Sequence, residues 1–351
     1  MRDVAVVSFA QAPLAPSTSG QTEAMMLLPV ITEALAQARL DRRDIGFTCS
    51  GSADYLTGGA FTFVQMLEAA GAWPPIPESH VEMDGAWALY EAWVRIQHGD
   101  IDTALVYASG RADPDALREI LCLQLDPYYL LPLWPDYRTM AALQAQAVLA
   151  ATGRTEADLA AIAVRSRADA KANPNAVVAG DFTAETLLAD DYVVAPLRPH
   201  DLPAIAHGAA AVVLAADDKA RALSDRPAWI TGIDHRVDPQ YPGVRDLATS
   251  PSTRLAAEQA GVGKDAVEVA ELAATSTAEE LVLIDALGLD GDVDVNPSGG
   301  ALVANPVMVT GLVRIGEAFR QVNAHGRERV VAHASSGPCL QQNLVCVMED
   351  K

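Results

Sequence analysis

The sequence has few cysteines and no recognisable set of metal ligands. Its four cysteines, Cys49, Cys122, Cys339 and Cys346, stand far apart, so they predict neither a disulfide framework nor a Cys-x-x-Cys knuckle. The seven histidines are dispersed as well, and we therefore expect no metal site. A Walker lysine, a Rossmann acidic residue and a G-x-S-x-G elbow are also missing, which argues against nucleotide-binding loops and serine hydrolases.

Long apolar runs and basic residues are scarce too. No run reaches about 18 apolar residues, and the start, MRDVAVVSFA, has no basic segment followed by an apolar one. We expect no membrane span, no signal peptide and a cytoplasmic location. The chain has 25 Lys and Arg against 46 Asp and Glu, a formal net charge of -21. Because such a chain repels phosphate backbones, nucleic acid is a poor candidate partner.

What the sequence does contain is an alternation of short apolar, β-branched runs with longer segments of helical period. The runs are residues 4–9, 103–108, 209–215, 228–233, 267–272 and 330–333, and two of the helical segments are 27–39 and 137–151. This alternation predicts an α/β fold, and 351 residues are enough for two units with separate cores.

The alternation occurs twice, with an offset of roughly 225 residues. "RDVAVVSF" resembles "PAWITGID", "EALAQARLDRRDIGFTCSG" resembles "RLAAEQAGVGKDAVEVAEL", and "WVRIQHGDIDTALVYASG" resembles "LVRIGEAFRQVNAHGRERVVAHASSG". We therefore expect an N-terminal half of residues 1–225, with a loop insertion at about 111–138, and a C-terminal half of residues 226–351.

Each half has a glycine-containing elbow before a helix, Asp84-Gly85 in the first and Ser298-Gly299-Gly300 in the second. Two helix N-termini should then meet near a pseudo-twofold axis. Helix N-termini carry unsatisfied N–H donors and partial positive charge, so such a place suits a nucleophile or an oxyanion.

Five stretches around this repeat resemble the thiolase superfamily. They are "DGAWALYEAWVRIQHGDIDTALVYASG", "ADLAAIAVRSRADAKANPNAV", "APLRPHDLPAIAHGAAAVVLAADDKA", "VEVAELAATSTAEELVLIDALGL" and "NPSGGALVANPVMVTGLVRIGEAFRQV". Within the superfamily the chain most resembles the lipid-transfer protein or sterol-carrier-protein-X branch, which includes thiolases and retro-aldolases of steroid side-chain degradation. The resemblance implies the thiolase fold, with two βαβαβαββ halves in a five-layer αβαβα sandwich, and CoA thioesters as substrates.

The resemblance also implies a cysteine nucleophile, which this chain does not have at the expected place. Aligned on Gly85, the nucleophile position is held by Glu82. Where the family has Gly-His-Pro, the chain has Asn305-Pro306, which offers an amide but no imidazole. The Cys-x-Gly-Gly pattern is approached only by "HASSGPC", in which Cys339 lies beyond Gly337, and His207 stands where the family has Asp before Gly-Ala-Ala.

In the block that the family writes Glu-Leu-His-Asp, or with Tyr in place of His in steroid aldolases, this chain has Glu271-Leu272-Ala273-Ala274. The expected catalytic set is therefore degenerate. The candidate catalytic residues are Glu82, His207 and Asn305, and the candidate substrate-binding residues are Gly85, Gly299, Gly300, Gly337, Cys339 and His333.

Each of these residues has a structural alternative. Glu82 fits a general base with a pKa raised by desolvation, but equally a helix cap or a partner contact. Asp84 fits an N-cap better still. His80 and His333 are expected beside the two elbows, either paired across the axis or buried for structural reasons. Cys339 is either a reactive thiol or a small core residue.

The insertion "RADPDALREILCLQLDPYYLLPLWPDY" is rich in Tyr, Trp and Leu but has only Arg111 and Arg118 as basic residues. It suits either a protein interface or core. A cationic clamp for the CoA phosphates would be weak here, so a bound CoA thioester is expected to be held mainly by another chain.

Three functions remain open at this point. The first is an accessory, non-catalytic subunit that pairs with an active thiolase-fold homologue, with an OB-fold/zinc-ribbon acyl-CoA-associated protein as a further candidate partner. The second is an active retro-aldol lyase on a CoA thioester, with no other cofactor. The third, an acetyl-CoA acyltransferase, is disfavoured by the missing cysteines. The sequence favours the first.

Overall fold

A ten-stranded sheet runs through the computed structural model, which describes residues 2–16, 20–73, 75–111, 113–289 and 291–351. The strands of the first half are β1 (Val4–Gln11), β2 (Phe47–Gly51), β3 (Glu78–Val81), β4 (Thr103–Gly110) and β5 (Gly208–Ala216). Those of the second half are β6 (Ala228–Val237), β7 (Val269–Leu272), β8 (Asp294–Val295), β9 (Arg329–Ser336) and β10 (Gln342–Glu349).

The two halves of the sheet have the same strand order. It is β3-β2-β4-β5-β1 in the first half and β8-β7-β9-β10-β6 in the second, and the halves join where β1 pairs with β6. In both halves the three outer strands are parallel and the last two run antiparallel to their neighbours. This agreement confirms the duplicated α/β pattern expected from the sequence.

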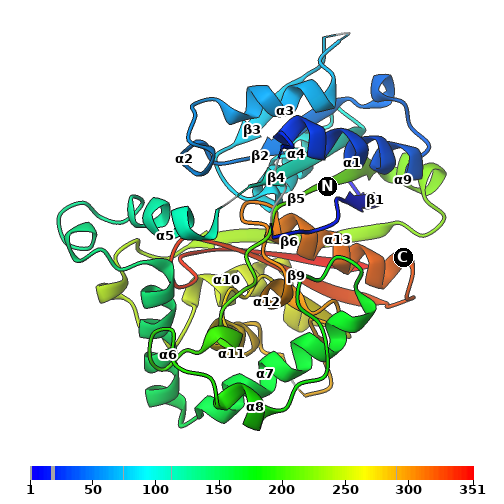
Figure 1. Ribbon diagram of the computed structural model, residues 1–351. Helices are drawn as coiled ribbons and strands as arrows, with labels where there is room; N and C mark the ends of the chain where they lie inside the picture. Colours follow the sequence, from blue (N-terminus) through cyan, green and yellow to red (C-terminus); the bar gives the residue numbers. More distant parts are fainter. Residues whose placement is uncertain (1, 17–19, 74, 112, 290) are drawn as a thin grey trace.

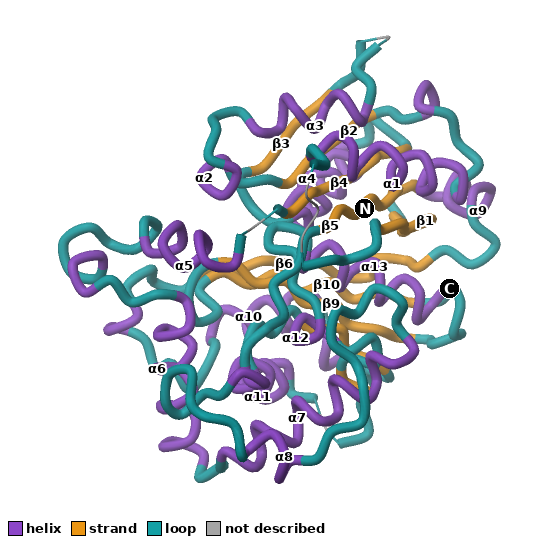
Figure 2. The backbone as a smooth tube through the Cα atoms, in the orientation of Figure 1, coloured by secondary structure: helices purple, strands orange, loops and turns teal. Residues whose placement is uncertain are grey.

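Helices lie on both sides of each half-sheet, in the five layers visible from top to bottom in Figure 1 and, by element type, in Figure 2. The helices are α1 (Glu23–Gln37), α2 (Asp54–Thr57), α3 (Thr62–Ala70), α4 (Gly85–His98), α5 (Pro114–Cys122), α6 (Tyr137–Thr152), α7 (Glu156–Asp169), α8 (Ala184–Leu188), α9 (Asp217–Leu223), α10 (Pro251–Ala260), α11 (Thr277–Leu287), α12 (Gly300–Val303) and α13 (Thr310–Asn323).

Three hydrophobic clusters fill the spaces between the layers. The central cluster joins α4 and α13 to one face of both half-sheets, for example through Leu89, Leu312 and Leu344. The other two clusters lie under the outer helices, with Leu27 in the first half and Leu283 in the second. The inner strands β1, β4, β5, β9 and β10 are largely buried on both faces, because alternate side chains point to opposite clusters, and this explains their nearly continuous apolar sequences.

The connection after the fourth strand differs most between the halves. Residues 111–207 join β4 to β5, whereas residues 337–341 join β9 to β10. Helices α6 and α7 of the longer connection contribute to the outer cluster of the second half and contact α11. A first-half segment thus covers the second half, while the division of the chain at residue 225 stays a prediction. Among the described residues, no helix has the length and hydropathy needed to cross a membrane.

Candidate active site

The start of α4 is held by Asp84, which caps two helices at once. Its Oδ1 accepts hydrogen bonds from the backbone N–H of Ala86 at 2.8 Å and of Leu312 at 3.0 Å, and its Oδ2 accepts one from Gly311 at 2.9 Å. Burial raises the pKa of this carboxyl, and the three donors oppose that shift. The N-termini of α4 and α13 therefore do meet, and the anion that they bind is a side chain of the protein itself.

Close packing at this point requires glycine. A Cβ on Gly85 would lie 2.8 Å from the Cβ of Ala108, and one on Gly311 would lie 2.4 Å from the Cβ of Ala334. The second elbow is thus Thr310-Gly311, at the start of α13. The expectation that Gly299-Gly300 forms it is wrong, because these glycines begin the separate short helix α12 and Gly299 packs against α7.

Glu82 lies in the bend between β3 and α4 and is exposed. Its Oε2 accepts a hydrogen bond from the backbone N–H of Asp54 at 3.0 Å, at the start of α2. Partial burial and the neighbouring Asp54 raise the pKa of the Glu82 carboxyl. The residue at the expected nucleophile position therefore anchors a surface helix.

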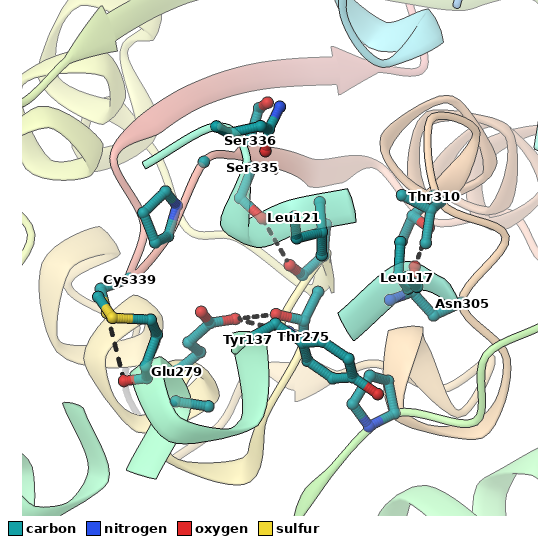
Figure 3. Close-up of a pocket in the computed structure, with 18 of the residues that line it drawn as sticks. Leu117, Leu121, Tyr137, Thr275, Glu279, Asn305, Thr310, Ser335, Ser336 and Cys339 are labelled. Carbon is teal, nitrogen blue, oxygen red and sulfur yellow. Dashed lines mark hydrogen bonds between the residues drawn. The ribbon is translucent and has the colours of Figure 1, made fainter. Parts of the chain in front are cut away.

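A cavity of about 160 Å³ lies where segments of both halves converge. One wall comes from the insertion, with Leu117 and Leu121 of α5 and Tyr137 of α6, and Tyr55 of α2 closes another side. Besides Gln124 and the two tyrosines, the polar side chains come from the second half, near the ends of β7 and β9 and near the starts of α11 and α13. They are Thr275, Glu279, Asn305, Thr310, Ser335 and Ser336 (Figure 3).

Asn305 lines this cavity, and hydrogen bonds hold both its backbone and its side chain. Its backbone N–H donates to the carbonyl of Ala204 at 2.8 Å, and its Oδ1 accepts a hydrogen bond from the hydroxyl of Thr310 at 2.5 Å. The amide oxygen is engaged in this way, so its Nδ2 is the group left to donate into the cavity.

Glu279 also lines the cavity and is only 5% exposed. Its Oε2 accepts hydrogen bonds from both the backbone N–H and the hydroxyl of Thr275, each at 2.7 Å. Burial raises the pKa of its carboxyl, and the two bonds from Thr275 oppose the shift. In Figure 3 Glu279 lies beside Thr275, with Asn305 and Thr310 toward the other side of the view.

Cys339 and Gly337 belong to the loop after β9 and line the cavity too. The thiol of Cys339 donates to the carbonyl of Met140 at 3.4 Å, and burial raises its pKa to about 12. A thiol in that state is a poor nucleophile, because only the thiolate reacts. Ser335 stands two residues before Gly337, as the cysteine of Cys-x-Gly-Gly stands two residues before its first glycine. The hydroxyl of Ser335 donates to the carbonyl of Ala273 at 3.0 Å.

The histidines lie elsewhere. His333 is buried in β9, its Nε2 lies 3.0 Å from Oδ1 of Asn343, and burial lowers its pKa to about 4. His80 stacks on Phe63 at 3.5 Å between ring centroids, so of the two alternatives the structural one fits His80 and pairing with His333 does not. The backbone of His207 bridges to Ala15 just before β5, and His207 is not among the described residues that line the cavity.

Of the residues expected from the sequence, the structure brings Asn305, Gly337 and Cys339 to one cavity and leaves the others outside it. Their roles stay predictions. Sequence reasoning missed Glu279, although it follows Ser276 by three residues, a spacing typical of a helix start. Among the described residues, no group of three His, Cys, Asp or Glu could hold a metal ion.

Comparison with known proteins shows what the chain is similar to. No family model matches the chain. The benzoylsuccinyl-CoA thiolase subunit BbsB of Thauera aromatica is 28% identical over 58% of this chain, and the match spans only 60% of that subunit. An acetyl-CoA acetyltransferase of Methanothermobacter thermautotrophicus is 25% identical, with 96% of this chain and 95% of the relative covered.

The solved structures agree with these relatives. The Ltp2-ChsH2(DUF35) aldolase superposes with a TM-score of 0.82 at 20% identity, covering 99% of this chain and 98% of the aldolase chain. At this identity the likeness establishes the fold, which is the thiolase fold. Together with the relatives in sequence, it shows that the chain has the thiolase fold and is similar to proteins of the thiolase superfamily.

Proposed function

We propose that this chain is a carbon–carbon lyase of the superfamily, which cleaves a β-hydroxyacyl-CoA thioester by retro-aldol chemistry instead of transferring an acyl group through cysteine. One observation carries the proposal. The cavity is lined by a carboxyl, two amides and several hydroxyls, whereas Cys339, the one thiol among its described lining residues, is protonated and bonded to a carbonyl. Acid–base and hydrogen-bonding groups suffice for a retro-aldol step, and a nucleophilic thiolate is not needed.

The size of the cavity limits the group next to the bond that breaks. A dry apolar cavity of about 150 Å³ accommodates benzene, so the 160 Å³ found here fits one ring or a short branched chain. The relative named for benzoylsuccinyl-CoA and the neighbour named as an aldolase are consistent with such a substrate. A steroid side chain stays a prediction, and its ring system would extend outside the cavity.

The proposal includes a partner subunit. No Lys or Arg is among the described residues that line the cavity, so cations for CoA phosphates must come from elsewhere. The tip of the insertion exposes large apolar side chains that suit a protein contact: Leu123, Tyr128, Tyr129, Leu133 and Trp134. A thiolase-fold homologue is the first candidate, since BbsB is itself named a subunit. An OB-fold/zinc-ribbon protein is the second.

A second function, the accessory subunit without chemistry of its own, is favoured by a different observation. Glu82 occupies the expected nucleophile position, yet it lies outside the cavity and holds the start of α2. A chain whose elbow serves only to cap helices fits a subunit that supports a catalytic homologue.

One set of assays tests both functions. We expect the purified chain, alone or with a thiolase-fold homologue, to convert 3-hydroxy-3-phenylpropanoyl-CoA to benzaldehyde and acetyl-CoA. Incubation with radiolabelled acetyl-CoA should leave every cysteine unlabelled, because the thiol in the cavity is protonated. Cleavage that resides wholly in the added homologue would favour the accessory function, and a labelled Cys339 would restore the acyltransferase.

A further inference from the structure

Glu279, in the first turn of α11, is both buried and part of the cavity wall. The carboxylates at the other helix starts described above, Glu82 and Asp84, do not line the cavity. Glu279 is the one carboxylate among the described lining residues. Both of its bonds from Thr275 go to Oε2, so Oε1 is not used by that contact. A carboxylate that is oriented by two donors on one oxygen keeps the other oxygen in a defined direction, as a general base must.

We infer that Glu279 is the residue that moves the proton in this cavity, taking it from the β-hydroxyl of the substrate and returning it to the α-carbon. The inference rests on the lyase function proposed above and goes further, because it assigns the acid–base role to a residue of α11 at a site away from the elbow of α4. Asn305, on another part of the same wall, supplies the amide donor for the thioester oxygen.

The step balances without any co-reactant. The Glu279 carboxylate accepts the proton of the β-hydroxyl, the freed electron pair forms the new carbonyl, and the bond between the α- and β-carbons breaks. Its electron pair moves to the α-carbon and the thioester oxygen as an enolate, to which Nδ2 of Asn305 donates. The Glu279 carboxyl then protonates the α-carbon. The products are one aldehyde or ketone and one shortened acyl-CoA.

The surroundings of Glu279 suit this role. Burial raises the pKa of its carboxyl, which brings proton release closer to neutral pH than for an exposed glutamate. Among the described residues, the other titratable groups that line the cavity are Tyr55, Tyr137 and Cys339. Burial raises the pKa values of the first and the last to about 12, so neither competes for the proton at neutral pH.

A structural role for Glu279 has to be separated from a catalytic one. It follows Ser276, whose hydroxyl accepts a hydrogen bond from the Glu279 N–H at 3.1 Å and caps α11. Glu279→Gln keeps a side-chain oxygen for Thr275 and so retains the cap, but it cannot carry the proton. Glu279→Asp keeps the carboxylate and disturbs the packing more. A purely structural residue would tolerate Gln better than Asp, and an acid–base residue the reverse.

The experiment compares these variants on 3-hydroxy-3-phenylpropanoyl-CoA, with and without a thiolase-fold homologue. The matched control is Glu185→Gln, at an exposed glutamate in the first turn of α8. We expect Glu279→Gln to lower kcat by about 10²- to 10⁴-fold with little change in KM, and to flatten the acidic limb of the pH profile. Glu279→Asp should retain more activity than Gln, and Glu185→Gln should match the wild type.

The possible results are distinct. Wild-type turnover that survives Glu279→Gln with an unchanged pH profile overturns the role of Glu279 and leaves the lyase function standing. Absence of turnover by the wild-type chain under both conditions overturns the lyase function and this role together. Infrared difference spectra of wild type against Glu279→Gln add a readout that needs no turnover. A carboxylic C=O band that titrates above the range of an ordinary glutamate supports the inference, and its absence counts against it.

Discussion

Asp84 and Glu279 each place a carboxylate at the start of a helix, one at α4 in the first half and one at α11 in the second. The Asp84 carboxylate is consumed by three backbone donors from two helices, with no room left for a ligand. Glu279 spends one oxygen on Thr275 and lines a cavity. The carboxylate at the start of α4 therefore stabilises the fold, whereas the carboxylate at the start of α11 is placed where it can contact a substrate.

The difference has a physical basis in what each carboxylate faces. The two N-termini at the pseudo-twofold axis concentrate partial positive charge, and a buried anion there is stabilised without a substrate. At α11 a single helix begins beside an apolar wall formed by α5 and α6, so the carboxyl is desolvated with only two donors to compensate. Burial raises the pKa of both carboxyls, so the difference between them is access: of the two, only Glu279 lines the cavity.

Removing the Asp84 carboxylate should have the largest effect on stability. Asp84→Ala leaves three buried N–H groups without an acceptor and uncaps α4 and α13 together, for a loss of roughly 4 kcal/mol in the free energy of unfolding. Chemical denaturation monitored by circular dichroism measures it. Glu82→Ala, two residues away, is the matched control and should cost only about 1 kcal/mol, because it removes a single exposed hydrogen bond at the start of α2. Equal losses in the two variants would contradict the assignment of Asp84 as the shared cap.

Much of the fold follows from the sequence because the apolar pattern has a period. The run at residues 4–9 lies within β1, and the helical segment at 137–151 within α6. The repeat then predicts that the two halves share one architecture, and the structure shows that they share one strand order. Periodicity shows that a helix has an apolar face but not which sheet it covers, so the packing of α6 and α7 on the second half could not be predicted.

The site was less predictable. Asn305, Gly337 and Cys339 line the cavity, whereas Gly299 and Gly300 were assigned to the wrong helix. Glu279 looks like an ordinary capping glutamate, since "STAEEL" gives the spacing of a helix start and nothing more. Only the fold shows that this helix start faces a cavity.

His333 lies on β9, two residues before the cavity residue Ser335. Its titration separates a role in stability from a role in the cavity. Its pKa of about 4, against an ordinary value of 6.5, means that the folded state holds the ring neutral. The unfolded state therefore binds the proton first as the pH falls. This contribution to stability is complete above about pH 6.5 and is lost as the pH falls toward 4, for a total of about 3 kcal/mol.

We expect His333→Gln to remove that part of the pH dependence. Unfolding free energies measured between about pH 7 and pH 4 should fall by about 3 kcal/mol more for the wild type than for the variant. His98→Gln, at a side chain that is 78% exposed, is the control and should follow the wild type. If His333→Gln instead abolishes cleavage while the pH dependence of stability is unchanged, the histidine belongs to the chemistry of the cavity.

The smallest effect on activity is expected for Glu82→Gln. Its comparison with Glu279→Gln tests directly which of the two carboxylates takes part in cleavage. Glu82→Gln keeps an oxygen for the N–H of Asp54 and removes a charge that lies outside the cavity. The value of kcat/KM for cleavage should therefore stay within about two-fold of the wild type, while Glu279→Gln loses it. When the two variants are assayed side by side, the one that loses activity identifies the carboxylate that transfers the proton. A large loss at Glu82 with little at Glu279 would return the chemistry to the elbow, where the family keeps its nucleophile.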